Sequence, residues 1–141
     1  SFNNQIGQSV KTTPEELYIL PKFDINYTRY EDGNKSNLKI WDKANTYEYA
    51  YMKGDKAYTV VDTNRDELPN ILIVGSSFTN ILESMCVPSF NKVVSIDYRH
   101  NKSGKSINDY VKEHNIDYVL FMPSQSNNAL SLKNVKLHLG L

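Results

Sequence analysis

Three short apolar runs stand out in the second half of the chain, at residues 71–74, 93–96 and 118–122. Each is four or five residues long and is almost free of charged residues. Continuous apolar runs of this length are typical of strands that are covered on both faces. The sequence therefore predicts three buried strands, the run at 118–122 included.

Helical patterns separate these runs. Between the first two, apolar side chains recur at helical spacing at Ile81, Leu82 and Met85. Before the third, Ser106 and Asp109 form a capping box, and a helix is expected to follow with one face made of Ile107, Tyr110, Val111 and His114. A β-α-β-α-β order with short helices predicts a parallel sheet with strand order 2-1-3. The fold class we expect is α/β, a flavodoxin-like, three-layer parallel sheet.

The first half shows a different pattern. Tyrosines alternate with other residues over 47–51, a turn follows at 53–56, and 57–61 returns as a second strand, which together predict a β-hairpin. Residues 31–37 are polar and predict a loop. We expect residues 1–68 to form an N-terminal extension of the same domain, and 69–141 the parallel unit. Cross-strand packing explains the tyrosine alternation, and a sugar-stacking platform is the alternative.

Composition narrows the function. The chain has 141 residues, with 16 basic and 16 acidic side chains that cancel. This balance argues against nucleic acid or an anionic membrane surface as the main partner. Cys86 is the single cysteine, so the chain forms no internal disulfide, and we expect neither a metal site nor a cofactor. Because the first residue is Ser1 and not Met, we expect that a signal or an upstream domain has been removed.

Polar residues follow each predicted strand. Gly75 to Asn80 follow the first, Asp97 to His100 the second, and residues 123–128 the third. In a parallel sheet these ends meet at one edge, where ligands bind. We expect Gly75 to allow a sharp turn that places Ser77 at a helix N-terminus, where free N–H groups can stabilise an oxyanion. A serine nucleophile also needs a base.

Two simpler explanations stay open for this turn. Serine and threonine are ordinary helix N-caps, so Ser76, Ser77 or Thr79 can serve that role alone. A dinucleotide-binding turn is the other alternative, because Asp97 stands about 20 residues beyond it, where a ribose-binding acid belongs. Gly75 is, however, one glycine where that fingerprint needs three.

The segment 71–82 resembles the nucleophile block of SGNH-like polysaccharide O-acetyltransferases, the alginate O-acetylation type and their DHHW-type relatives. Residues 96–99 and 116–121 resemble the following blocks of the same proteins, and the likeness extends over roughly 38–128. The resemblance implies that Ser77 is the nucleophile and that Arg99 lies near the acyl site. The remaining residues that it implies for the oxyanion and substrate sites are Gly75, Ser76, Asn80 and Asp97.

The sequence departs from that family in two ways. Ser76 replaces the usual Asp of the block, and no Asp-x-His pair, the family's base, occurs in the chain. Asp97-x-x-His100 has the spacing of another SGNH dyad, but it follows the second strand, where the family pattern expects Asp and Arg. His100 is thus the one candidate base by position, and His114 is expected to be half-buried or to interact with its helix C-terminus.

We therefore expect the C-terminal part of an SGNH-like acyl-ester enzyme, an O-acetyltransferase or esterase, with little activity in this form. The resemblance implies an extracytoplasmic polysaccharide or another acylated carbohydrate as substrate, and an upstream domain or a membrane-bound acyl-transfer protein as partner. A non-catalytic carbohydrate-binding or scaffolding domain of the same fold is the alternative.

Overall fold

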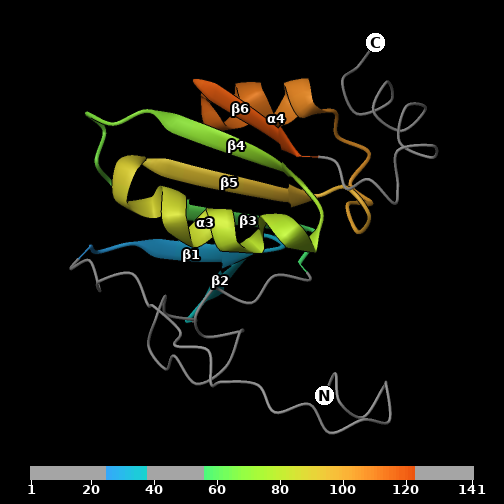
Figure 1. Ribbon diagram of the computed structural model, residues 1–141, viewed down its shortest axis with the longest axis horizontal. Helices are drawn as coiled ribbons and strands as arrows, with labels where there is room; N and C mark the ends of the chain where they lie inside the picture. The colour runs from blue at the N-terminus through green and yellow to red at the C-terminus, as the bar shows by residue number, and fades with distance from the viewer. Residues whose placement is uncertain (1–24, 38–55, 123–141) are drawn as a thin grey trace, which may run out of the picture.

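A six-stranded sheet with the order β2-β1-β3-β5-β4-β6 organises the molecule (Figure 1). The computed structural model describes residues 25–37 and 56–122. The strands are β1 (Thr28–Glu31), β2 (Asn34–Ser36), β3 (Tyr58–Asp62), β4 (Asn70–Gly75), β5 (Lys92–Asp97) and β6 (Tyr118–Met122). The helices are η1 (Ser77–Thr79), α3 (Asn80–Cys86), η2 (Val87–Ser89) and α4 (Ile107–His114).

The second half of the chain forms the parallel part of the sheet. β4 lies in the middle and pairs in parallel with β5 on one side and with β6 on the other. The predicted strand order 2-1-3 is confirmed. In this register Gly75 stands opposite both Asp97 and Met122, so the three strands end at the same edge.

The other strands are antiparallel, which makes the whole sheet mixed. β3 pairs with β5 and with β1, and β1 forms a hairpin with β2. The loop prediction for 31–37 holds only for the two-residue hairpin turn at Asp32 and Gly33 and for residue 37, because Glu31 ends β1 and Asn34–Ser36 form β2. Asp32 and Gly33 both have positive φ, 48° and 84°, as a type I′ turn requires.

Only the second strand of the predicted tyrosine hairpin can be compared with the structure. Residues 47–51 lie outside the described residues, whereas 57–61 corresponds to β3. The strands that flank β3 in the sheet are β1 and β5, so the N-terminal segment and the parallel unit share one sheet.

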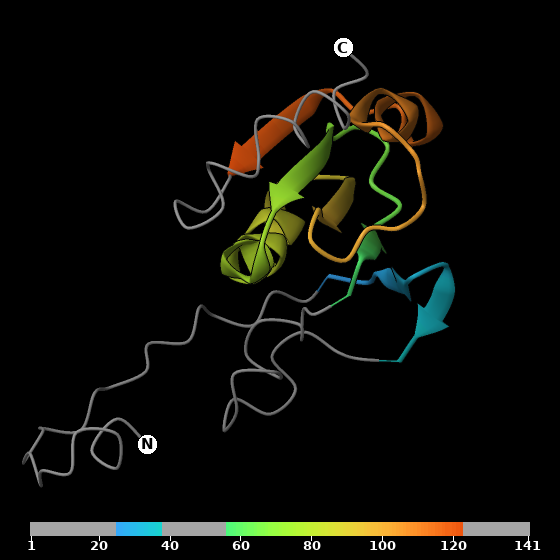
Figure 2. The same ribbon diagram turned by 90° about the vertical axis from the view of Figure 1, so that its right-hand side faces the viewer.

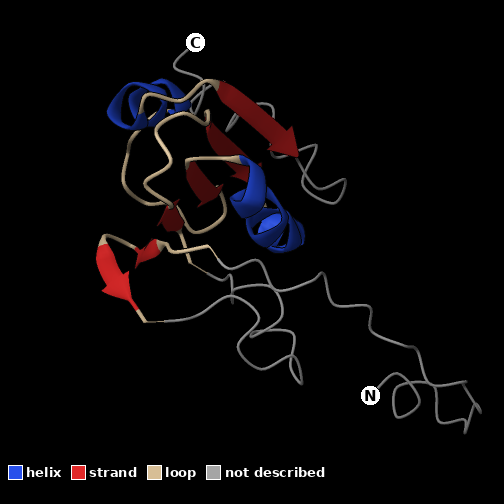
Figure 3. Cartoon of the chain, turned by 90° about the vertical axis from the view of Figure 1, so that its left-hand side faces the viewer, coloured by secondary structure: helices blue, strands red, loops and turns tan. Residues whose placement is uncertain are grey.

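One helix packs on each face of the sheet (Figures 2 and 3). Under α3 the core consists of Val61, Ile71, Ile73, Val87 and Val93. Under α4 it consists of Val60, Leu72, Val74, Val94, Ile96, Ile107 and Tyr110. Side chains of β4 alternate between the two clusters, because neighbouring residues of a strand point to opposite faces. Coverage on both faces explains why 71–74 is a continuous apolar run.

β6 does not match the prediction of a buried strand. Tyr118 is 59% exposed, Val119 48% and Met122 43%. Only Leu120 packs partly against a core cluster. Its sequence is as apolar as that of β4, but it is the last strand of the described sheet and pairs with one neighbour there.

Both predicted helices are present. Ser106 caps α4 as predicted: its side chain accepts a hydrogen bond from the backbone of Asp109, and the Asp109 carboxylate accepts one from the backbone of Ser106. The helix ends at Asn115, which has a φ of 50°, a left-handed conformation that asparagine tolerates. In the described residues no helix is long and apolar enough to span a membrane.

Candidate active site at the end of strand β4

The turn that follows β4 carries the candidate nucleophile. Ser76 is extended, with φ −110° and ψ −170°, and Ser77 is the first residue of η1. The backbone N–H of Thr79 donates to the carbonyl oxygen of Ser76 at 2.9 Å, which closes the first helical turn. Ser77 therefore lies at the first helical position after the central parallel strand.

Gly75 is required at this turn for space. A Cβ at this position would lie 2.2 Å from Thr79 Cγ2 and 2.9 Å from the carbonyl oxygen of Met122. Among the described glycines, positive φ occurs at Gly33 and Gly104 and not at Gly75. The expected role of Gly75 in a sharp turn is thus replaced by a steric one: the helix approaches the strand end too closely for any side chain.

The hydroxyls of Ser76, Ser77 and Thr79 do not act as side-chain N-caps. Neither η1 nor α3 has a side-chain capping bond. Thr79 Oγ1 donates to the carbonyl oxygen of Ser76 at 2.7 Å, and Ser76 Oγ is buried without a hydrogen-bond partner among the described residues. Ser77 is half-buried, and its hydroxyl makes no hydrogen bond to the described residues. Capping alone does not explain these serines.

Two further residues of the turn border Ser77. Asn80 begins α3, and its backbone N–H donates to the carbonyl oxygen of Ser77. Its side chain makes no hydrogen bond to the described residues. Phe78 is 78% exposed, and sequence reasoning missed it, because a phenylalanine inside an apolar-rich block gave no signal of exposure.

Asp97 and Arg99 form a close ion pair at the end of β5. Arg99 Nη2 lies 2.5 Å from Asp97 Oδ2, and Nε lies 2.9 Å from Oδ1. The backbone N–H of Arg99 also donates to Oδ1, at 2.9 Å. Asp97 is buried, whereas the Arg99 side chain is 33% exposed. The structure therefore ties the two predicted residues to each other, directly beside the β4 turn by strand register.

His100 has no partner that would make it a base. Its ring makes no hydrogen bond to the described residues, and its backbone N–H donates to the carbonyl oxygen of Asp97 at 3.0 Å. The Asp97 carboxylate is held by Arg99 instead. Asp97 and His100 thus form no dyad, and within the described residues no imidazole is hydrogen-bonded to Ser77.

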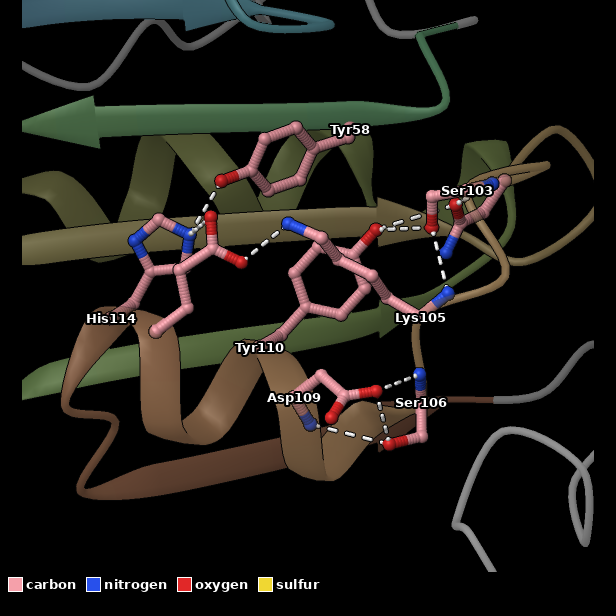
Figure 4. A network of polar contacts seen from close by, with 9 residues as sticks. Tyr58, Ser103, Lys105, Ser106, Asp109, Tyr110 and His114 are labelled. Atoms are coloured by element: carbon pink, nitrogen blue, oxygen red, sulfur yellow. Dashed lines mark hydrogen bonds and ion pairs between the residues drawn. The ribbon is translucent and has the colours of Figure 1, made fainter.

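His114 belongs to a separate polar network on α4 (Figure 4). Its Nε2 lies 2.5 Å from the hydroxyl oxygen of Tyr58 on β3. Burial lowers the pKa of His114 from its ordinary value, and the nearby Glu113 carboxylate opposes this change. Burial also raises the pKa of Tyr58. His114 is half-buried and serves the packing of α4, on the face opposite to α3.

The remaining titratable groups give no metal site. No group of three His, Cys, Asp or Glu side chains suited to a metal occurs in the described part of the chain. Cys86 is half-buried on α3, and burial together with Glu83 raises the pKa of its thiol, which disfavours the reactive thiolate.

Comparisons with known proteins give the fold. No protein-family model matches the sequence, and no curated protein matches it significantly. Among solved structures, Bacillus cereus PatB1 with a sulfonyl adduct matches with a TM-score of 0.58 and 23% identity, over 74% of this chain and 39% of that one. A DHHW family protein from Eubacterium siraeum matches with a TM-score of 0.60 and 21% identity, over 82% and 41%.

The chain thus spans about two fifths of the length of these proteins. At such low identity the likeness concerns the fold alone.

Proposed function

We propose that this chain carries the nucleophile of an SGNH-like acyl-ester enzyme, an O-acetyltransferase or an esterase. The observation that carries the proposal is the position of Ser77. It opens the first helical turn after the central parallel strand, and its hydroxyl makes no hydrogen bond to the described residues. A fold shared with PatB1, an O-acetyltransferase, and with a DHHW family protein supports it.

In the proposed reaction, Ser77 Oγ attacks the carbonyl carbon of an acyl ester, and the alcohol oxygen leaves with a proton. The backbone N–H groups of Ser77 and Phe78 precede the first bonded N–H of η1, that of Thr79, so helix geometry leaves them for the oxyanion. Arg99, held by Asp97, orients the substrate. The acyl group then passes to a sugar hydroxyl or to water.

The proton of Ser77 requires a base, since a serine hydroxyl is a weak nucleophile without one. No hydrogen bond joins His100 or His114 to Ser77 in the described part of the chain, and the sequence contains no Asp-x-His. We therefore assign the base to an Asp-x-His pair supplied from outside this sequence, upstream in the family pattern. In this scheme the substrate is an extracytoplasmic polysaccharide or another acylated carbohydrate. The acyl donor is delivered by an upstream domain or a membrane-bound partner.

The test supplies the base from solution. A sulfonyl fluoride reacts with an activated serine, and imidazole added to the buffer can replace a missing histidine. We expect imidazole to accelerate sulfonylation at Ser77, located by peptide mass spectrometry, and Ser77→Ala to abolish it. Ser76→Ala is the matched control, because it removes the neighbouring hydroxyl and leaves the nucleophile.

Hydrolysis of a simple acetyl ester by the same variants completes the experiment. We expect no turnover by the chain without added base, and no effect of His100→Ala on the imidazole-dependent reaction. Turnover that needs both Ser77 and His100 would show that His100 is the base. Failure of every form to react at Ser77 would reject the enzyme proposal.

The alternative, a non-catalytic carbohydrate-binding or scaffolding domain, is favoured by one observation. The carboxylate of Asp97, which would orient His100, is occupied by Arg99. Under this alternative, acetylated polysaccharide co-sediments with the wild-type chain and equally with Ser77→Ala, and neither form is sulfonylated at position 77.

A further inference from the structure

A carboxylate is buried under the helix that begins at the candidate nucleophile. The helical segment from η1 to η2 turns a stripe toward the sheet, at the i, i+4 and i+8 positions Thr79, Glu83 and Val87. Glu83, in the middle of this stripe, is 2% exposed. Glutamate is almost never fully buried unless it is paired, and no sequence pattern indicates that Glu83 is buried.

Two strands hold this carboxylate. Arg29 Nη1 on β1 donates to Glu83 Oε1 at 2.7 Å, and Thr59 Oγ1 on β3 donates to Oε2 at 2.8 Å. Arg29 is 1% exposed and Thr59 is 3% exposed. Each carboxylate oxygen is thus bonded to a different strand. We refer to Arg29, Thr59 and Glu83 as the buried carboxylate cluster.

Stability alone does not account for such a cluster. Burial raises the pKa of Glu83, and the Arg29 guanidinium and the Thr59 hydroxyl oppose that rise. Well-packed apolar side chains of similar volume are often as stable as a buried ion pair or more so. Apolar packing is not directional, whereas hydrogen bonds are. A carboxylate bonded to two fixed partners therefore holds α3 in one rotation about its axis.

The helix that this cluster fixes is continuous with the Ser77 turn. At the N-terminal end Thr79 packs against Gly75 without space for another atom. Beyond the other end, the Arg65 guanidinium donates to the carbonyl oxygens of Val87, Pro88 and Phe90. Between these two attachments, Glu83 makes the charged contact of α3 with the antiparallel strands.

We propose that Glu83 is a positioning residue for Ser77: its bonds to Arg29 and Thr59 fix the rotation of α3 and thereby the orientation of the Ser77 turn. The proposal rests on the proposed function for its catalytic meaning. A rotation of α3 moves Ser77 relative to Asp97 and Arg99, which are anchored on β5 and do not follow the helix. Small displacements of a reacting group cost large factors in rate.

The test separates orientation from stability. Glu83→Leu removes one carboxylate from the buried Arg29 guanidinium, which keeps the Glu31 carboxylate at 3.1 Å from its Nε, and the double variant Arg29→Met with Glu83→Leu replaces the Arg29–Glu83 ion pair by apolar packing. Glu83→Gln keeps the shape and loses the charge: the amide oxygen can accept from Arg29, and the amide NH2 can donate to Thr59 Oγ1 in a reversed bond. Glu67→Gln changes an exposed charge as a matched control. The readouts are the thermal midpoint, the backbone amide chemical shifts of residues 76–80, and the rate of imidazole-assisted sulfonylation at Ser77.

We expect the double variant to regain the thermal midpoint lost in Glu83→Leu, but with shifted amide resonances at 76–80 and sulfonylation slower by about tenfold or more. Glu83→Gln and Glu67→Gln should keep the wild-type resonances and rate. If the other variants fail to fold, Thr59→Val provides the test. It removes one of the two hydrogen bonds to Glu83 and should shift the same resonances.

A double variant with wild-type resonances at 76–80 would overturn the proposal, because apolar packing would then orient the turn equally well. Shifted resonances with an unchanged rate in a reactive protein would overturn it too. If the wild-type chain is not sulfonylated at all, the proposed function fails, and the amide resonances alone still decide whether Glu83 orients the turn.

Discussion

Two neighbouring atoms limit position 75 to glycine. Thr79 Cγ2 and the carbonyl oxygen of Met122 both lie within 3 Å of the place that a Cβ would occupy. The threonine methyl can be removed by mutation, but the backbone oxygen of β6 can yield only if the strand shifts.

We expect Gly75→Ala to lower the free energy of unfolding by about 1–3 kcal/mol, the usual cost of overpacking a tight site. Thr79→Ser removes Cγ2 and keeps the hydroxyl that donates to Ser76, so the double variant should recover part of this loss. Chemical denaturation measures both. Ser77→Ala, at a half-buried position whose hydroxyl makes no hydrogen bond to the described residues, is the control and should change stability by about 0.5 kcal/mol or less. An unchanged Gly75→Ala would contradict the steric account.

Sequence patterns indicated which polar residues follow the strands at the candidate site, but not which of them bind each other. Asp97 and Arg99 are two residues apart and follow a predicted strand, which places both at the sheet edge. That they bind each other depends on side-chain rotamers, which no periodicity encodes. Likewise, serines at a predicted helix start favour capping, yet Ser76 Oγ is buried and finds no hydrogen-bond partner in the part of the chain that the structure describes.

At the scale of elements, α4 is the helix that the sequence specifies most completely. Its capping box combines two local bonds: the Asp109 N–H donates to Ser106 Oγ at 3.2 Å, and the Ser106 N–H donates to Asp109 Oδ2 at 2.7 Å. Both partners lie within four residues, so the signal is local and readable from sequence.

Ser106→Ala should therefore cost about 1 kcal/mol of stability. The variant removes the acceptor for one N–H of the first turn and leaves the apolar face of α4 intact. Circular dichroism during thermal unfolding gives the change in midpoint. Ser106→Thr, which retains a capping oxygen, should stay near the wild type. Equal losses in both variants would mean that packing and not capping is affected.

The β1–β2 hairpin and the exposure of β6 show two features that sequence patterns did not predict. Asp32-Gly33 is a standard hairpin signal, but β1 carries Arg29 where an apolar residue would normally point into the core. The buried Arg29 charge is paired with Glu31 on the same strand and with Glu83, which lies 54 residues away in the sequence. For β6, an apolar run indicates a strand but not what covers it.

At the scale of the whole molecule, the order of the parallel strands follows from alternating strands and helices, whereas β1, β2 and β3 were not expected to extend the same sheet. Connections of helical length force parallel neighbours. The pairing of β3 with β5 has no such local cause. β3 pairs with β5 on the side away from β4, and the sequence of β3 does not specify that neighbour.

The pH dependence of stability should reflect His114, which lies between α4 and β3. Burial lowers its pKa from the ordinary value of 6.5, with Lys92 and Lys105 acting in the same direction and Glu113 and Asp62 against it. The unfolded chain therefore binds the proton more readily than the folded one. Stability should be full above about pH 6.5 and should fall as the pH decreases below it.

Denaturant unfolding between roughly pH 5 and pH 7.5 measures this effect. His114→Gln cannot be protonated, so its stability should change less across this range than that of the wild type. NMR titration of the His114 ring, with and without Tyr58→Phe, gives the pKa directly. A ring that titrates above 6.5 in the folded protein would reverse the sign and contradict the prediction.

The packing around Gly75 also bears on how sequence variation among relatives is to be interpreted. An invariant glycine before a serine is often taken as the mark of a catalytic motif. Here a close approach of helix and strand would preserve glycine at position 75 even in a lineage that had lost all activity. Conservation of Gly75 would thus indicate that the fold is retained. Only conservation or loss of the serine at position 77 would distinguish an active enzyme from an inactive relative.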